Sequence, residues 1–280
     1  MSFGKFISSR TWVVTGAASG LGLELTKIIA KNHGRVWALD IQEPALTHLS
    51  EISRREGWDV MTKVVNITDT PAVTRLLDEI KRESRALNVW INNAGIQKVG
   101  SFAGQSEAEF DSVMEVNFNS VVRATREVIR IMNDQGDGIV LNIASMAGQL
   151  PAPFMSAYVA SKHALLGFSR SLRAELSLQK SPLRCAVASP GFVDTSIIAK
   201  GQESGFPDWL SWVLASPDAC AMDILTSLAK GQDEIVPTLN GKVMRKAYQW
   251  APDLTVMSSR LLLSRSARDF VLNRYQIPRK

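Results

Sequence analysis

The chain holds few of the residues from which disulfide or metal scaffolds are built. Only two of its 280 residues are cysteine and three are histidine. Cys185 and Cys220 belong to no CxxC or Cys/His cluster, so the spacing excludes a disulfide framework and supplies no zinc ligand set. We therefore expect two reduced, buried thiols in a cytoplasmic protein without a metal site.

Long hydrophobic runs are missing as well. No stretch of about 20 consecutive apolar residues occurs, and the first residues, MSFGKFISSRTWVV, contain no apolar segment of the length of a signal peptide. With 45% hydrophobic and 21% charged residues, the composition indicates a globular protein rather than a disordered or fibrous one. The length is that of one large domain, or of one domain with a small appendage.

Acidic residues are in the minority, with 27 Asp and Glu against 32 Lys and Arg. The excess of positive charge is confined to residues 242–280, which hold nine basic and two acidic residues. Residues 1–241 are therefore slightly acidic. We predict a catalytic domain over residues 1–241 and a separate basic extension over residues 242–280.

Short apolar runs alternate with longer segments of helical period along most of the chain. Each run is rich in Val, Ile or Trp and ends in a polar or small residue. This alternation predicts a doubly wound parallel α/β sheet, the Rossmann fold, with ligands beyond the carboxyl ends of the strands. We predict six buried strands and a seventh short one: Thr11–Gly16, Arg35–Asp40, Asp59–Asn66, Asn88–Gly95, Gly138–Ser145, Leu183–Gly191 and Glu234–Thr238.

Capping residues mark the expected ends of the helices. The first long helix is predicted to end with Gly34 as its C-cap. After the third strand, Thr68 or Thr70 is the predicted N-cap, with Pro71 at the first helical position. A further helix is predicted over Pro217–Lys230.

A glycine-rich turn, TGAASGLG, joins the first predicted strand to the first long helix. Gly16, Gly20 and Gly22 would let the backbone approach a pyrophosphate at the helix N-terminus. Asp40 ends the second strand, where a carboxylate accepts hydrogen bonds from both adenosine ribose hydroxyls and repels a 2′-phosphate. The pattern favours NAD over NADP. The alternative is that Asp40 only caps the turn before Pro44.

Further motifs follow the glycine turn in a fixed order. They are NNAG, VNFNS with Asn117, NIASMAG with Ser145, YVASK with Tyr158 and Lys162, and PGFVDT after the sixth strand. Over residues from about 10 to 240, this order resembles the short-chain dehydrogenase/reductase family. The resemblance implies a nicotinamide-dependent oxidoreductase whose catalytic residues are Asn117, Ser145, Tyr158 and Lys162.

The chemistry of these residues agrees with that expectation. Tyr158 and Lys162 are four residues apart in a segment of helical period and therefore share one face. A phenol with a pKa of about 10 is a weak base at neutral pH, and a fixed ammonium beside it favours the phenolate. Tyr158 would take the hydroxyl proton of an alcohol, or donate it to a ketone, while Ser145 holds the substrate oxygen.

The resemblance also implies how the remaining site residues act. Lys162 contacts the nicotinamide ribose, Asn117 positions a water that carries the proton away, and Val193 with Thr195 clamps the nicotinamide carboxamide. Asn66 stands where the family usually has Asp beside the adenine. The expected cofactor contacts are Gly16, Ser19, Gly20, Leu21, Gly22, Asp40, Ile41, Asn66, Ile67, Asn93, Ala94, Gly95, Tyr158, Lys162, Pro190, Val193 and Thr195.

Each motif taken alone also has a purely structural explanation. Tyr158 and Lys162 would then be a packed aromatic and a solvated lysine, Ser145 a strand-end cap, and Asn117 a helix-interior amide bonded to backbone. The presence of all four in the expected order favours catalysis over these alternatives.

The segment 196–216 is the predicted substrate-covering loop, and it is rich in Ile, Phe and Trp. Helical spacing of its tryptophans would also fit an ordinary core-facing helix. As a loop at the mouth of a site it suits a lipophilic alcohol or ketone, such as a steroid, a retinoid or a fatty chain. The expected substrate contacts are Ser145, Met146, Phe154, Tyr158, Phe192 and Trp209.

The basic extension contains two amphipathic segments separated by Pro252, KVMRKAYQWA and LTVMSSRLLLSRSARDFVL, which predict two helices. A basic amphipathic helix suits peripheral contact with an anionic membrane. The alternative, slightly favoured, is a terminal helix that packs on its own domain or on a neighbouring subunit. No nucleic-acid-binding motif is present, so we expect no nucleic-acid partner.

These observations predict an NAD-dependent short-chain alcohol dehydrogenase or ketone reductase for a lipophilic secondary alcohol or ketone, with oxidation as the expected direction. One alternative is a 3-oxoacyl-thioester reductase, whose acyl carrier protein or coenzyme A substrate is acidic and would meet the basic extension. A second alternative is a catalytically silent NAD-binding scaffold protein. The resemblance implies a homodimer or homotetramer.

Overall fold

A seven-stranded parallel sheet in the order β3-β2-β1-β4-β5-β6-β7 crosses the molecule. The computed structural model describes residues 1–84, 86–193 and 214–251. The sheet order changes direction between β1 and β4, which creates the crevice where doubly wound folds bind ligands. The predicted Rossmann architecture is confirmed, with strands β1 Thr11–Thr15, β2 Arg35–Asp40, β3 Val60–Val64, β4 Val89–Asn92, β5 Gly138–Ile143, β6 Leu183–Ala188 and β7 Glu234–Ile235.

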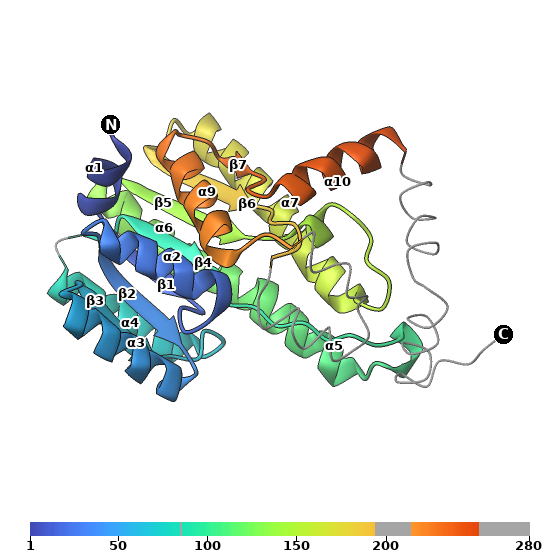
Figure 1. Cartoon of the computed structure of the whole chain (residues 1–280), viewed down its shortest axis with the longest axis horizontal. Coiled ribbons are helices and arrows are strands. Elements are labelled where there is room, and N and C mark those ends of the chain that lie inside the picture. Colours follow the sequence, from blue (N-terminus) through green and yellow to red (C-terminus); the bar gives the residue numbers. More distant parts are fainter. Residues whose placement is uncertain (85, 194–213, 252–280) are drawn as a thin grey trace.

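Helices cover both faces of the sheet, and α2 and α9 lie in front of it in Figure 1. The helices that contribute to the core on that face are α1 Phe3–Ser8, α2 Gly20–Lys31, α3 Glu43–Glu56 and α9 Pro217–Ala229. The other face is covered by α4 Thr70–Glu83, α6 Ser120–Gln135 and α7 Ser156–Leu178. The remaining helical segments are η1 Phe102–Gly104, α5 Glu107–Met114, η2 Glu115–Asn119, η3 Met146–Gly148 and α10 Leu239–Trp250.

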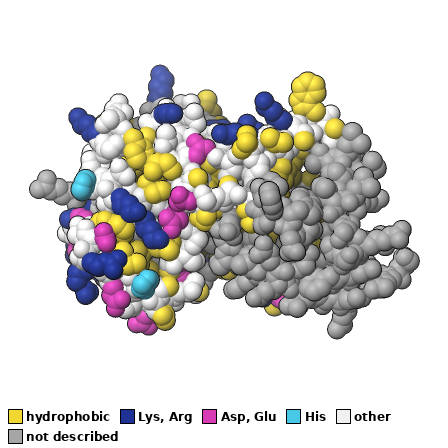
Figure 2. Space-filling model, in the orientation of Figure 1, with side chains coloured by type: hydrophobic (Ala, Val, Ile, Leu, Met, Phe, Trp, Pro, Cys, Tyr) yellow, Lys and Arg dark blue, Asp and Glu magenta, His cyan; other side chains and the backbone are white. Residues whose placement is uncertain are grey.

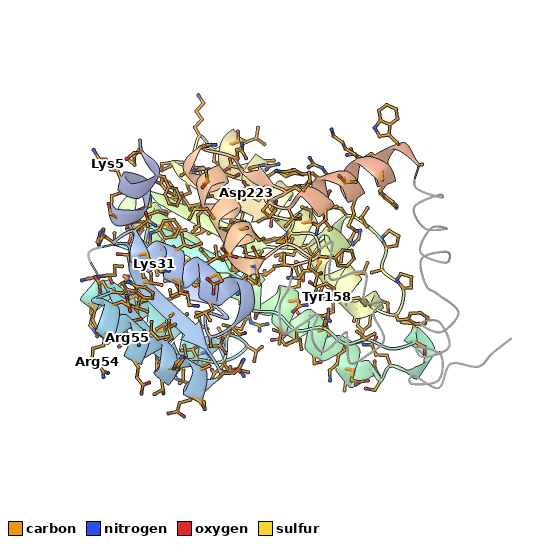
Figure 3. The ribbon with its side chains drawn as sticks, viewed as in Figure 1. Lys5, Lys31, Arg54, Arg55, Tyr158 and Asp223 are labelled. Atoms are coloured by element: carbon orange, nitrogen blue, oxygen red, sulfur yellow. The ribbon has the colours of Figure 1, made fainter. Side chains whose placement is uncertain are left out.

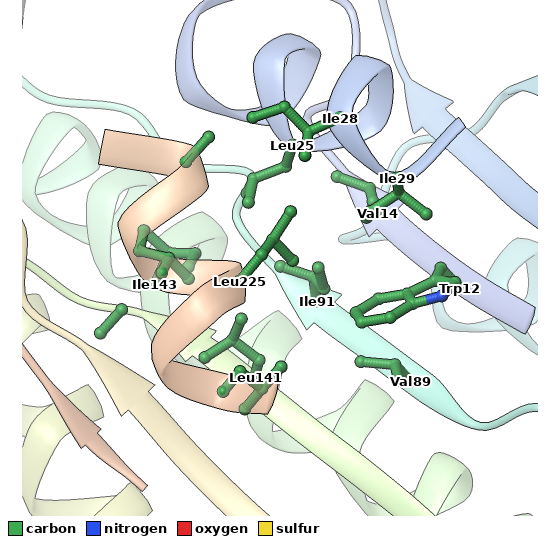
Figure 4. Close-up of a cluster of buried hydrophobic side chains, with 14 of the residues drawn as sticks. Trp12, Val14, Leu25, Ile28, Ile29, Val89, Ile91, Leu141, Ile143 and Leu225 are labelled. Atoms are coloured by element: carbon green, nitrogen blue, oxygen red, sulfur yellow. The ribbon is translucent and has the colours of Figure 1, made fainter. Parts of the chain in front are cut away.

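Three tryptophans anchor the core on opposite faces of the sheet. Trp12 packs with Leu25 and Leu225 between the sheet and the α2–α9 layer (Figure 4). Trp37 and Trp90 are buried in the cluster on the opposite face. Because side chains alternate along a strand and both faces are covered, the strands read as continuous hydrophobic runs rather than as alternating ones.

The third predicted strand is less buried than its sequence suggested. Four of the five residues of β3 are only partly buried, and Val64 is 55% exposed. The physical reason is the position of β3 at the edge of the sheet, with β2 as its only neighbouring strand. The prediction of a buried strand is wrong here.

Two predicted helix caps are also wrong. The α2 helix ends with Asn32 as its C-cap, and His33, at φ +62°, takes the left-handed position assigned to Gly34. The Gly34 N–H still donates to the Ile29 carbonyl, which completes a Schellman motif. At the start of α4 the N-cap is Asp69, whose carboxylate accepts a hydrogen bond from the backbone of Ala72.

Cys185 and Cys220 are buried and form no disulfide, as predicted. Burial raises the pKa of each thiol to about 12, so both are poor nucleophiles and poor metal ligands at neutral pH. In the described part of the chain, no helix is long and apolar enough to cross a bilayer.

Candidate active site

The predicted cofactor and catalytic residues meet at the carboxyl edge of the sheet. The glycine turn follows β1, and Asp40 is the last residue of β2. The loop that holds Asn93, Ala94 and Gly95 leaves β4, Ser145 comes two residues after β5, and Pro190 comes two residues after β6. Parallel strands end on the same side, so motifs far apart in the sequence become neighbours.

The glycine turn makes a close backbone approach that no larger residue permits. Gly16 lies at φ +65°, where a side chain is strained, and a Cβ there would come within 2.8 Å of the Ala94 Cα. At Gly22 a Cβ would lie 2.0 Å from the Gly16 carbonyl oxygen. The turn delivers the chain to Gly20, where α2 begins. This cradle fits a pyrophosphate, since the first N–H groups of a helix have no partner within it.

Asn93 joins the glycine turn to the loop after β4. Its Nδ2 donates to the carbonyl oxygens of Thr15, at 2.9 Å, and Gly16, at 3.1 Å. In return, the Thr15 Oγ1 accepts hydrogen bonds from the backbone N–H groups of Asn93, at 2.9 Å, and Ala94, at 3.0 Å. Asn93 of the NNAG motif therefore stabilises the shape of the glycine turn, in addition to its expected contact with the ribose.

Asp40 is buried and bonded to backbone through both carboxylate oxygens. Oδ2 accepts from the N–H of Ala18 at 2.9 Å, and Oδ1 accepts from those of Ile41, at 2.7 Å, and Gln42, at 3.1 Å. Asp40 therefore caps its own turn, as the structural alternative stated, and also ties β2 to the glycine turn. A carboxylate accepts about four hydrogen bonds, so it keeps capacity for a ribose hydroxyl.

The residues expected beside the adenine lie in the loop after β3. The Asn66 side chain is exposed, and its Oδ1 accepts hydrogen bonds from the N–H and hydroxyl of Thr68, at 3.0 and 2.9 Å. Ile67 is partly buried beside it. Asn66 thus shapes the turn through its oxygen, which leaves the amide nitrogen as the group suited to an adenine edge.

Lys162 is a buried cation on α7 without a carboxylate partner among the described residues. It is 4% exposed, and its Nζ donates to the carbonyl oxygen of Ile143 at 2.8 Å. The Nζ also lies 5.7 Å from the centre of the Tyr158 ring, one helical turn away. Burial lowers the pKa of Lys162 to about 8. The pKa of this ammonium therefore lies close to neutral pH.

The Tyr158 phenol is set between two opposing influences. Burial raises its pKa, and the hydrogen bond with Ser145 lowers it, with burial the larger of the two. The Ser145 Oγ also accepts a hydrogen bond from the N–H of Ala147 at 3.1 Å, which fixes the side chain at the start of η3. The structure thus brings Ser145, Tyr158 and Lys162 together as one cluster.

Asn117 lies in a π-helical turn, η2, that the sequence did not reveal. The side chain is buried, with Oδ1 accepting from the Ile96 N–H and Nδ2 donating to the Ile96 carbonyl, both at 2.8 Å. Nδ2 also donates to Ser161 Oγ at 3.0 Å. Asn117 is thus bonded to backbone, as its structural alternative stated. A Cβ on Gly95 would lie 3.2 Å from Asn117 Oδ1 and 3.7 Å from Lys162 Nζ, which places Asn117 beside the cluster of Ser145, Tyr158 and Lys162.

Ser161 is a site residue that the sequence reasoning missed. Its buried hydroxyl donates to the Tyr158 carbonyl oxygen at 2.8 Å while accepting from Asn117. Ser161 therefore couples the π-helical turn to the first turns of α7. The available signal was its place immediately before Lys162 in the YVASK motif.

The loop after β6 is held from two sides. The Pro190 carbonyl oxygen accepts from the Met146 N–H at 2.8 Å, and the Gly191 N–H donates to the Thr238 hydroxyl at 2.9 Å. Val193 forms an isolated β-bridge with Ala215. The prediction for Thr195 lies outside the described residues.

The predicted substrate contacts differ in how exposed their side chains are. Phe154, at φ +64°, and Phe192 are partly exposed. Met146 is buried, and it packs in a cluster with Tyr248 of α10, so α10 contacts the η3 turn that follows β5. The boundary predicted after residue 241 falls inside α10. Trp209 and residues 196–213 of the predicted loop lie outside the described residues.

Comparison with known proteins agrees with this geometry. A family model described as short chain dehydrogenase matches residues 10–204. A putative oxidoreductase, SadH, of Mycobacterium tuberculosis is 27% identical over 252 residues, which cover 85% of this chain and 91% of that protein. A 3-oxoacyl-[acyl-carrier-protein] reductase of Chlamydia muridarum is 28% identical over 83% of this chain and 94% of its own length. A 3alpha-hydroxysteroid dehydrogenase of Mediterraneibacter gnavus is 29% identical over 69% of this chain and 77% of its own length.

Solved structures share the fold. A short-chain dehydrogenase/reductase of Burkholderia phymatum in complex with NAD superposes with a TM-score of 0.79 at 23% identity and covers 88% of this chain and 94% of its own. An actinorhodin polyketide ketoreductase with NADPH gives a TM-score of 0.75 at 24% identity, over 81% of this chain and 94% of its own. At such identities the likeness shows the shared fold.

Proposed function

We propose that this chain, which belongs to the short-chain dehydrogenase/reductase family, interconverts a lipophilic secondary alcohol and its ketone with NAD. Membership of this family makes it a nicotinamide-dependent oxidoreductase. The observation that supports catalysis most strongly is the cluster of Ser145, Tyr158 and Lys162 at the sheet edge. A silent scaffold protein has no need of a buried ammonium held against a tyrosine ring.

The cluster supplies the proton transfer that accompanies hydride transfer. The glycine turn and the Asn93–Gly95 loop would hold the nicotinamide cofactor, which would supply the hydride acceptor for oxidation or the hydride donor for reduction. Ser145 holds the substrate oxygen, and Tyr158 takes its proton during oxidation or donates a proton during reduction. Lys162 lowers the energy of the phenolate through its charge. Asn117 and Ser161 hold the loop at Ile96 and the start of α7 in register around this centre.

The proposal of NAD over NADP rests on Asp40. Its buried carboxylate sits at the end of β2, held against the glycine turn by the Ala18 N–H. A fixed negative charge there favours ribose hydroxyls and repels a 2′-phosphate. The glycine cradle with Asn93–Gly95 would hold the pyrophosphate and ribose, and Asn66, Pro190 and Val193 would complete the cofactor contacts.

The substrate class is proposed from the apolar residues around the site and from the relatives. Phe154 and Phe192 are partly exposed aromatic side chains. Phe154 follows Ser145 in the same loop after β5, and Phe192 lies in the loop after β6, the strand that pairs with β5. One relative carries a hydroxysteroid dehydrogenase name, which favours a bulky lipophilic alcohol. The second candidate, a 3-oxoacyl-thioester reductase, is favoured by another relative's name and by the basic extension.

We also propose a cytoplasmic homodimer or homotetramer whose basic extension, residues 242–280, meets a membrane. The buried, unbonded thiols suit a reducing compartment. A membrane contact suits a substrate that dissolves in lipid.

A substrate panel tests the proposed function. Steroids, retinoids, fatty alcohols and 3-oxoacyl thioesters are each offered with NAD(H) and with NADP(H), and NADH or NADPH absorbance is followed. We expect NAD-dependent turnover of a lipophilic alcohol that disappears in Tyr158→Phe. Turnover of thioesters alone would replace the substrate class, a preference for NADP would refute the role given to Asp40, and cofactor binding without any turnover would favour the scaffold.

A further inference from the structure

The last described helix, α10, carries two chemically distinct faces. Its inner face packs Met244 and Tyr248 against Met146 and Leu150. At 100° per residue, Leu239, Val243 and Trp250 lie together on the opposite side of the helix. These three apolar side chains are 78%, 59% and 89% exposed. They form an outward stripe about 17 Å long, at 1.5 Å per residue.

Lys242 and Lys246 lie beside this stripe, whereas Arg245 lies about 120° or more from it around the helix, on the side of the groove described below. Lys242 and Lys246 are exposed and Arg245 is partly exposed, and α10 contains no acidic residue. Lys242 makes a 3.6 Å ion pair with Asp223 of α9, whereas Arg245 and Lys246 make no ion pair within the described residues. Figure 2 shows dark blue and yellow side chains together over α10 at the upper right. The helix therefore presents two unpaired cations beside exposed apolar surface.

A groove runs along the base of this face. It has a volume of about 500 Å³ and is bounded by the end of α9, β7 and α10. Apolar side chains of Val236, Leu239 and Val243 line it together with all three basic residues of α10. Its one carboxylate, Glu234, is already neutralised by Arg170 and Arg173 of α7. The lining of the groove is thus net positive and partly apolar.

Resting on the membrane contact proposed above for residues 242–280, we propose that the outer face of α10, defined by Leu239, Lys242, Val243, Lys246 and Trp250, docks onto the surface of an anionic lipid bilayer, with Arg245 beside it in the groove. Trp250 and Val243 enter the boundary between headgroups and acyl chains, where a tryptophan ring is well accommodated. Arg245 and Lys246 contact anionic headgroups, one of which occupies the groove.

Charge complementarity selects this occupant over a second copy of the chain. Two copies meeting face to face through α10 would bring like charges together without an acidic partner on either helix. An anionic bilayer supplies the missing negative charge over the whole face. Figure 1 shows α10 projecting away from the sheet, and the exposed side chains of Leu239, Val243 and Trp250 show that its outer side is accessible. The contact is peripheral, because no described helix can span a bilayer.

Vesicle binding by the full chain tests the proposal without cofactor or substrate, so its result is independent of the proposed reaction. The protein is mixed with phosphatidylcholine vesicles, with or without phosphatidylserine, and the bound fraction is measured by sedimentation. We expect binding that requires phosphatidylserine and weakens with salt. The double variant Arg245→Gln, Lys246→Gln should bind roughly 25-fold more weakly, at about fivefold per cation. The double variant Val243→Ser, Trp250→Ser should lose at least about tenfold.

Matched controls lie far from α10. Arg54→Gln with Arg55→Gln removes two cations from α3, which Figure 3 shows at the opposite end of the molecule. Leu178→Ser removes an 86% exposed apolar residue from the end of α7. Both controls should bind like the wild type. Unchanged binding in the α10 variants, or equal binding to vesicles without phosphatidylserine, would overturn the proposal. Self-association in sedimentation velocity that Val243→Ser, Trp250→Ser disperses, without vesicle binding, would assign the face to subunit contact.

Discussion

The two sides of the candidate site are held together by different forces. On the cofactor side, the glycine turn and Asn93 meet through backbone contact and paired hydrogen bonds, with no charge buried apart from Asp40. On the proton-transfer side, the buried Lys162 ammonium donates to one carbonyl oxygen among the described residues, that of Ile143. Shape therefore determines the first side, and electrostatics determines the second. Steric changes should damage the cofactor side most, and changes of charge should act on the other.

The largest effect is expected at Gly22. Gly22→Ala would place a methyl group 2.0 Å from the Gly16 carbonyl oxygen, a backbone atom, and 2.4 Å from Asn93 Nδ2, which is held by two hydrogen bonds. The backbone must move apart, so we expect a loss of about 3 kcal/mol or more in the free energy of unfolding. Urea denaturation and NAD titration measure the two consequences.

Gly167 of α7 provides the control for this steric effect. A Cβ there meets nothing within 4 Å, so Gly167→Ala should stabilise the helix by about 0.5–1 kcal/mol. Wild-type stability and NAD affinity in Gly22→Ala would show that close backbone contact does not determine the cofactor side.

The next effect belongs to the buried charge. Burial lowers the pKa of Lys162 from 10.5 to about 8, so the unfolded chain binds this proton more tightly than the folded chain. The free energy of unfolding should therefore rise as the pH goes from about 8 to 10.5, by about 3 kcal/mol from this group.

Lys162→Met should abolish that rise. At pH 7 this variant should have a higher free energy of unfolding than the wild type, although it loses activity. Denaturation curves over this pH range measure both. Lys31→Met, at an exposed position on α2, should keep the wild-type pH dependence. An identical rise in Lys162→Met and the wild type would remove Lys162 as its source.

A smaller effect is expected at Asn93, whose side chain holds the glycine turn by two hydrogen bonds. Asn93→Ala leaves the Thr15 and Gly16 carbonyl oxygens without their side-chain donor. We expect a loss of about 2 kcal/mol in the free energy of unfolding, together with weaker NAD binding. Asn119→Ala, which removes only an exposed contact with Glu115, should cost less than about 0.5 kcal/mol. Equal losses in the two variants would contradict the stabilising role given to the Asn93 hydrogen bonds.

The smallest effect is expected at Ser161, which joins Asn117 to the first turns of α7. Ser161→Ala removes one acceptor from Asn117, which keeps its two hydrogen bonds to Ile96. A loss of about 1 kcal/mol is expected in denaturation, with a fall in kcat at unchanged NAD affinity. Ser177→Ala, on the exposed end of α7, should change neither quantity. A weaker NAD affinity without a change in kcat would assign Ser161 to the cofactor side.

The sequence predicted the residues whose identity alone determines their role. Gly22 is required because nothing larger fits, and Tyr158 and Lys162 share a face because four residues make about one helical turn. The seven strands were predictable because a sheet covered on both faces needs continuous apolar runs. Burial of the edge strand β3 was overestimated, because its sequence does not show that one side lacks a neighbour.

Other features depend on contacts that the sequence does not show. Gly34 looked like a C-cap, but its lack of a Cβ serves packing, since a Cβ would lie 2.6 Å from Ile29 Cγ2, and His33 takes the left-handed turn instead. Three adjacent residues around Asp69 are all good N-caps, and only the geometry selects Asp69. The π-helical turn at Asn117 is defined by tertiary bonds to Ile96, which lies 21 residues earlier in the chain.

The central claim is that Tyr158 moves the proton while the glycine turn holds the cofactor. It is tested most directly in Tyr158→Phe by measuring turnover and NAD affinity on the same preparation. We expect kcat to fall by roughly 10²–10⁴-fold, while the Kd for NAD stays within about twofold, since the phenol oxygen is one of many expected cofactor contacts and the glycine turn is unchanged. Turnover close to that of the wild type would contradict the account.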